Sequence, residues 1–149
     1  MEVKIKRVDK TLSLPLYETD GAVAFDYLAR KNIKIKPGKI GLIPGNVIIK
    51  IPRGFMILIA PRSSMPRKTG LIFPHSVGIV DRDYCGADDE HMIQVFNPTK
   101  KTIEIKRGER IAQGVFVRIE KAKWTEVKNI SQKSRGGFGS TGKISNLKI

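Results

Sequence analysis

The chain has 149 residues, the usual length of a single domain and enough to bury a hydrophobic core without disulfide bonds. Its one cysteine, Cys85, excludes a disulfide framework and a Cys/His metal cluster, and it favours a reducing location, which we take to be the cytoplasm. Residues 1–8 alternate apolar and charged side chains, and no apolar run approaches membrane-spanning length. We therefore expect a soluble protein with neither a signal sequence nor a membrane segment.

The charge is strongly unbalanced, with 28 Lys and Arg residues against 14 Asp and Glu residues and a net charge of +14. Such an excess predicts an anionic partner, either a nucleic acid or a small polyphosphate. The lysines are scattered along alternating segments, with no basic helix and no aromatic residues between them. This pattern favours a small anion and argues against nucleic acid as the main partner.

Short segments of strand-like periodicity follow one another along most of the chain. They lie at residues 3–8, 32–36, 47–51, 55–60, 92–96, 102–106 and 111–119. Glycine and proline pairs separate them, as at Pro37-Gly38 and Arg107-Gly108. Short strands at regular spacing predict an all-β jelly-roll sandwich or barrel. We expect at most one short helix, after Pro61, with Ser63 or Ser64 supplying N-cap oxygens.

The last part of the chain changes in character, and the sequence divides into a β domain at residues 1–130 and a C-terminal arm at 131–149. The arm is rich in glycine and serine and cannot bury enough surface to order itself. A flexible tail is one interpretation. The other is a lid, because Phe138 could stack on a base while Lys133 or Arg135 approaches phosphates.

The acidic stretch that follows Ile79 and Val80 is unusual in so basic a chain. In a strand, Asp81 and Asp83 would project from one face and Arg82 from the other. The stretch is therefore either a catalytic edge or a turn.

Five segments together resemble the motifs of the trimeric deoxyuridine triphosphate nucleotidohydrolases, the dUTPases. They lie in the order typical of that family, at residues 21–26, 61–64, 78–86, 108–113 and 136–142. The resemblance covers nearly the whole chain. It implies a jelly-roll fold of the dUTPase type, a homotrimer with shared active sites, and hydrolysis of dUTP to dUMP and pyrophosphate.

The resemblance also implies roles for single residues. Asp81 would activate the water that attacks the α-phosphate, and Tyr84 would exclude a ribose 2′-hydroxyl. Phe138 would stack on the base, and Mg²⁺ would be bound through the substrate phosphates. The substrate-binding positions would be Arg62, Ser63, Ser64, His75, Gly78, Ile79, Tyr84, Met92, Gln113, Lys133, Arg135, Phe138, Gly139 and Ser140. Asp26, Asp83 and Arg110 would support them from behind.

Several positions depart from the family pattern. Tyr27 replaces a leucine after the first-motif aspartate, and Lys133 stands where an arginine is usual, so either Lys133 or Arg135 could contact the γ-phosphate. Residues 87–91 are about three residues longer than usual, and we expect the acids of this segment to be solvated loop charges. His91 receives no role.

The related dCTP deaminases, including bifunctional deaminase/dUTPases, are the rival interpretation, since the 62–70 segment resembles theirs. They need a glutamate where this chain has Gln94, which cannot act as a general acid or base. A basic β-sandwich that binds nucleotides or nucleic acid without catalysis is the non-enzymatic alternative.

Overall fold

The computed structural model describes residues 1–134 and 136. In this part of the chain, ten strands and one short helix follow one another. Their bounds are β1 Lys4–Arg7, β2 Phe25–Leu28, β3 Ile33–Ile35, β4 Ile40–Pro44, β5 Val47–Lys50, β6 Phe55–Pro61, α1 Met65–Thr69, β7 Gly78–Val80, β8 Met92–Phe96, β9 Ile103–Ile105 and β10 Arg110–Arg118.

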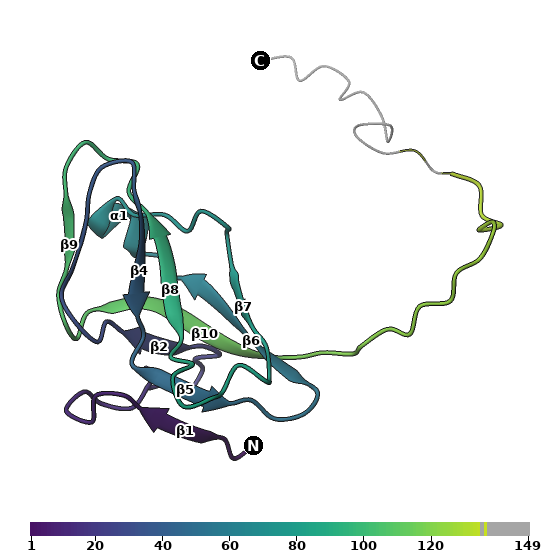
Figure 1. The fold of residues 1–149 in the computed structure, drawn as a ribbon, viewed down its shortest axis with the longest axis horizontal. Helices are drawn as coiled ribbons and strands as arrows, with labels where there is room; N and C mark the ends of the chain where they lie inside the picture. Colours follow the sequence, from purple (N-terminus) through teal and green to yellow (C-terminus); the bar gives the residue numbers. More distant parts are fainter. Residues whose placement is uncertain (135, 137–149) are drawn as a thin grey trace.

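The strands pair antiparallel into one four-stranded sheet and three two-stranded sheets. The large sheet has the order β2-β10-β6-β7, and the small ones are β1-β5, β3-β9 and β4-β8. Most partners are far apart in the sequence, and the strands wrap around a common interior (Figure 1). The predicted jelly-roll class is confirmed.

Alternation of apolar and polar residues explains why these segments form strands. In β3 and β9, Ile35 and Ile105 are buried, while Lys34 lies opposite Glu104 on the exposed face. The turns between strands use left-handed residues, with φ of 66° at Gly38 and 84° at Gly108. A side chain is strained in this conformation, which is why glycine occupies the predicted turns.

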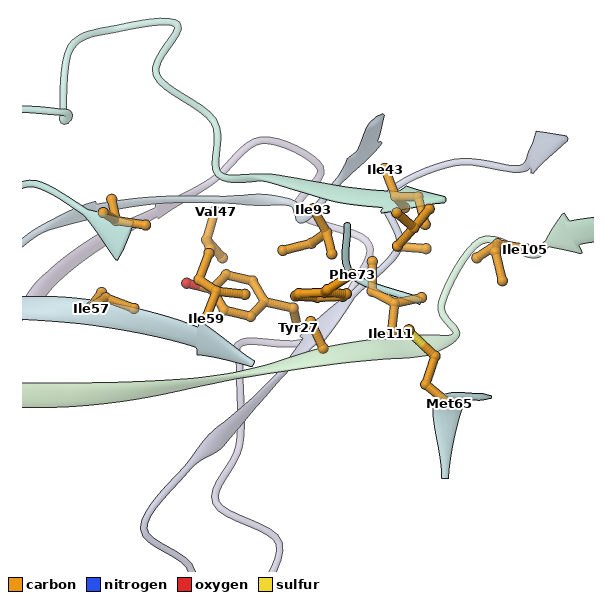
Figure 2. Close-up of a cluster of buried hydrophobic side chains, with 14 of the residues drawn as sticks. Tyr27, Ile43, Val47, Ile57, Ile59, Met65, Phe73, Ile93, Ile105 and Ile111 are labelled. Atoms are coloured by element: carbon orange, nitrogen blue, oxygen red, sulfur yellow. The ribbon is translucent and has the colours of Figure 1, made fainter. Parts of the chain in front are cut away.

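The core is a single cluster of aliphatic and aromatic side chains between the sheets. Tyr27 and Phe73 lie in its middle, and Ile93, Ile111 and Val47 surround them (Figure 2). Tyr27 is fully buried, so the tyrosine that departs from the family's leucine is a core residue with a hydroxyl to satisfy.

One local prediction is corrected by the structure, and β10 contains an irregularity that periodicity does not predict. The helix α1 begins where expected, with Ser64 at the N-cap, but no side chain caps it by a hydrogen bond. In β10, the pairing register shifts between Arg110 and Ala112, and Ile111 and Ala112 are both buried. A β-bulge breaks alternation in this way and increases the local twist.

The chain leaves the β body after β10. From residue 119 to residue 134 it forms no helix or strand and extends away from the sheets (Figure 1). Apolar side chains are exposed there, with Trp124 at 90% and Ile130 at 79%. The division at residue 130 stays a prediction, because most of the arm lies outside the described residues. Among the described residues, no helix has the length and apolarity needed to span a membrane.

Candidate active site

Six of the residues predicted to act on the substrate line one cavity of about 430 Å³. They are His75, Gly78, Ile79, Asp81, Tyr84 and Met92. Their elements are the loop before β7, β7 itself, the loop after it, and the first residue of β8. The neighbouring wall includes Leu42, Ile59, Val80, His91 and Gln94.

Asp81 stands at the rim of this cavity because β7 ends one residue earlier, at Val80. The chain turns there, as the Tyr84 backbone N–H donates to the Asp81 carbonyl at 3.2 Å and the Cys85 N–H donates to Asp83 at 2.9 Å. Asp81 and Asp83 therefore lie outside the strand and do not share a strand face. Asp81 also lines a second hollow, of about 840 Å³, together with Asp83, Arg53 and Lys121.

Two sheet edges border the cavity. β7 is the last strand of the four-stranded sheet, and β8 is one edge of the β4-β8 pair. Strand edges carry backbone N–H and C=O groups in a fixed plane, which suits recognition of a flat polar ring. His75 lies beside them and stacks on Phe73, with ring centroids 5.8 Å apart and planes 11° from parallel.

Two of the predicted substrate-binding residues, Arg62 and Ser64, line a different hollow of about 580 Å³, together with Arg110, which was predicted as a supporting residue. Asp26, buried in β2, forms ion pairs with both arginines, with Oδ1 3.2 Å from Arg62 Nε and Oδ2 3.5 Å from Arg110 Nη1. The Glu18 carboxylate also pairs with Arg110 and raises the pKa of its guanidinium. Asp26 thus orients the two cations from behind.

The remaining predicted residues are placed in part. Gln113 lies in β10, and its Nε2 donates to the Pro61 carbonyl at 3.3 Å. Ser63 is exposed beside Arg62, and Lys133 is exposed in the extended segment. Arg135, Phe138, Gly139 and Ser140 lie outside the described residues. Arg62 and Ser64 therefore line a different hollow of the chain from Asp81.

The structure corrects the expectation for the 87–91 segment. Asp88 is exposed, as expected of a loop acid, but Glu90 is buried. Both Glu90 oxygens accept from Arg30, from Nε and Nη2 at 2.8 Å each, and Oε1 also accepts from the Asn46 backbone N–H. A partly buried carboxylate held by a bidentate arginine is not a solvated charge.

His91 is the site residue that sequence reasoning missed. The residue is only 1% exposed, yet it lines the cavity together with Tyr84. Nδ1 lies 2.8 Å from the Tyr27 hydroxyl, and Nε2 has no hydrogen-bond partner among the described residues. The tyrosine in place of leucine indicated a buried hydroxyl that needs a partner. That partner, His91, is 64 positions away, so the sequence did not identify it.

Within residues 1–134 and 136, no three His, Cys, Asp or Glu side chains lie together as metal ligands.

Comparison with known proteins agrees over nearly the whole chain. The dUTPase family model matches residues 10–142. The deoxyuridine 5′-triphosphate nucleotidohydrolase of Dictyoglomus turgidum is 36% identical over 148 residues, which span 95% of this chain and 99% of that protein.

Solved structures give the same answer. The dUTPase of Streptococcus mutans is 30% identical, with a TM-score of 0.74 over 80% of this chain and 98% of that one. The dUTPase of Staphylococcus bacteriophage 80alpha, solved with dUPNHPP, superposes with a TM-score of 0.83 at 23% identity, over 95% of this chain and 98% of that one. The chain belongs to the dUTPase family.

Proposed function

We propose that this chain hydrolyses dUTP to dUMP and pyrophosphate, removing dUTP from the DNA precursor pool and supplying dUMP for dTMP synthesis. Family membership supports the reaction. The observation that carries the proposal is the shared cavity, in which Asp81, Tyr84 and the edges of β7 and β8 meet. The base of one nucleotide would lie at the strand edges, its sugar at Tyr84 and its first phosphate at Asp81.

Uracil would bind between the two strand edges. Backbone groups of Gly78, Ile79 and Met92 would pair with its carbonyl and imide groups as a neighbouring strand would. His75 would contribute at the same edge. Backbone N–H groups only donate and backbone carbonyls only accept. A base edge with the opposite pattern, such as that of cytosine, would therefore not pair with them.

The sugar would pack against Tyr84. Tyr84 is 42% exposed and lines the cavity. A ring held against the 2′ carbon leaves no room for a hydroxyl there, so ribonucleotides would be excluded by contact.

Asp81 would act as the general base. It would accept a proton from a water molecule while that water attacks the α-phosphorus. The bond from the α-phosphorus to its bridging oxygen breaks, and pyrophosphate leaves with that oxygen. The positive surface of the chain favours approach of the triphosphate.

Arg62, Ser63, Ser64 and Gln113 would hold the phosphates, with Asp26 and Arg110 positioning Arg62 and Asp83 supporting the loop. Lys133 or Arg135 would reach the γ-phosphate, and the Phe138-Gly139-Ser140 segment would cover the base. Mg²⁺ would bind phosphate oxygens and reduce the charge of the leaving pyrophosphate.

A homotrimer with shared sites would bring the proposed base, Asp81, together with the proposed phosphate-binding residue, Arg62. Asp81 and Arg62 line different hollows of one chain, so a neighbouring chain would supply the arginine. An apolar groove of about 270 Å³, lined by Val3, Leu14, Tyr17 and Phe116 among others, offers surface for such packing. We also propose a cytoplasmic location.

A substrate panel tests the proposal. With Mg²⁺ present, pyrophosphate release is expected from dUTP, and dCTP, dTTP and UTP should be turned over far more slowly. Release of ammonia from dCTP would instead support a deaminase, although Gln94 lines the cavity and lacks a titratable group. Binding of oligonucleotides without turnover of any triphosphate would support the non-enzymatic module.

A further inference from the structure

Tyr84, the residue that would select the sugar, rests on a support made by Glu90 and His91. The Tyr84 hydroxyl donates to the Glu90 carbonyl at 3.3 Å. Its ring centroid lies 6.2 Å from that of His91, with the planes tilted by 32°. Tyr84 is partly exposed, whereas both supporting residues are buried. Glu90 and His91 therefore contact the side of Tyr84 that faces the protein interior.

Glu90 is anchored in three directions. The Arg30 guanidinium donates to both carboxylate oxygens, and the Asn46 backbone N–H donates to Oε1 at 2.8 Å. Bidentate pairing restricts rotation as well as distance. The carbonyl that accepts the Tyr84 hydroxyl therefore belongs to a residue with little freedom to move.

His91 is anchored through its backbone and its ring. Its N–H donates to Val47 at 2.9 Å, and its carbonyl accepts from Gly45 at 2.8 Å. Its Nδ1 is held by Tyr27, whose hydroxyl lies in the core. The position of the imidazole is thus restrained both by its backbone and by the hydrogen bond at Nδ1.

The hydrogen bond between Tyr27 and His91 also sets the tautomer. Burial lowers the pKa of His91 to about 4, so the ring is neutral and carries one N–H. Burial raises the pKa of Tyr27, so its phenol keeps its proton. If Tyr27 donates, only the Nε2–H lacks a partner; the reverse direction would leave the phenol proton and Nε2 both unsatisfied.

A polar pair of this kind is a poor choice for stability alone. Two apolar side chains would fill the space without an unsatisfied N–H. They would lack direction, however, because packing restrains rotation of a ring less sharply than a hydrogen bond does. The pair holds the plane of the imidazole against which Tyr84 lies.

We propose that Tyr27, Glu90 and His91 are positioning residues that fix the Tyr84 ring and thereby set the discrimination between deoxyribo- and ribonucleotides. This inference rests on the proposed function. Rejection of one hydroxyl by contact needs a ring that cannot tilt away, since a small displacement opens room for an oxygen atom. Loosening the support should admit UTP more than it harms dUTP.

The test compares kcat/KM for dUTP and UTP in the parent and three variants. Tyr27→Phe removes only the hydrogen bond, and His91→Leu removes the imidazole. In both, the dUTP/UTP ratio is expected to fall about tenfold, mainly through a rise in UTP turnover. The control is Ile51→Val, which trims a buried core residue outside the cavity lining and should leave the ratio unchanged.

A crystal structure of each variant gives a readout that does not depend on turnover. Tyr84 should be displaced or occupy more than one rotamer in Tyr27→Phe, and should stay as in the parent in Ile51→Val. An unchanged ratio with an unmoved Tyr84 in Tyr27→Phe overturns the inference. So does an equal loss of dUTP and UTP turnover, which would indicate a purely structural role.

These outcomes are distinct from failure of the proposed function. A parent protein that releases no pyrophosphate from dUTP would overturn the function, and the crystal structures would still test the support. A Tyr84 that stays fixed in every variant overturns the inference even if dUTP hydrolysis is confirmed.

Discussion

Asp81 is the residue on which the proposed chemistry depends. Asp81→Asn keeps the shape of the side chain and removes the proton acceptor, so kcat for dUTP should fall by about 10²–10⁴-fold. Affinity for a non-hydrolysable dUTP analogue, measured by calorimetry, should stay close to that of the parent.

Asp88→Asn is the matched control, because Asp88 is an exposed acid of the same loop and lies outside the cavity lining. Its kcat should equal that of the parent. Retained activity in Asp81→Asn would remove Asp81 from the role of base.

His91 should make the stability of the fold depend on pH. Its pKa is lowered by burial from 6.5 to about 4, so between these values the unfolded chain binds more protons than the folded one. Stability is therefore complete above pH 6.5 and falls by about 3 kcal/mol as the pH drops to 4.

Urea unfolding of the parent and of His91→Leu across this range measures the effect. The variant should show a flatter dependence on pH, since the carboxylates that titrate nearby are common to both proteins. Identical slopes would show that His91 is protonated as easily in the fold as in the unfolded chain.

Among single residues, those that share a local sequence motif could be predicted from the sequence. Asp81 and Tyr84 are three positions apart, and the short loop that follows β7 brings both to one cavity. Glu90 and His91 were not predicted, because their partners Arg30 and Tyr27 lie 60 and 64 positions away. Only the folded chain shows that an apparent loop acid is an anchor.

Among the elements, β10 joins the site to the core, and Gly114 in this strand packs closely against two buried rings. A Cβ at this position would lie 2.5 Å from Phe25 Cζ and 2.8 Å from Tyr27 Cε2. Gly114→Ala should therefore destabilise the protein by about 1–3 kcal/mol, because two buried rings would have to move.

Thermal unfolding measures this, with Gly21→Ala as the control. A Cβ at Gly21 meets nothing within 4 Å, so that variant should unfold at the temperature of the parent. Equal unfolding temperatures for both variants would show that the Phe25 and Tyr27 rings can move aside without loss of stability.

The elements were predictable where alternation and turn residues agree. Ile33–Ile35 and Ile103–Ile105 show this, because each has isoleucines on one face and a charge on the other. The register shift in β10 was not predictable, since Arg110-Ile111-Ala112 reads as an ordinary alternating strand. The point at which β7 ends depends on the turn that Asp81 and Tyr84 form, which periodicity does not report.

For the whole molecule, the question is whether one active site draws on more than one chain. Mixing two inactive proteins tests this: Asp81→Asn, which has the arm but not the base, and a truncation before Ser131, which has the base but not the arm. After joint refolding, about a quarter of the sites should combine both parts if the arm serves a neighbouring chain.

Each protein alone should show crippled turnover. A mixture as inactive as its components would mean that each arm serves its own chain. Full activity of the truncated protein by itself would make the arm a linker. Sedimentation of the parent checks the trimer on which the mixture depends.

The most direct measurement for the whole account is a single turnover of dUTP in ¹⁸O-labelled water. Attack by the Asp81-activated water on the α-phosphorus places the label in dUMP and leaves pyrophosphate unlabelled. This turnover should be lost in Asp81→Asn. Label in pyrophosphate would place the attack on the β-phosphorus and contradict the account.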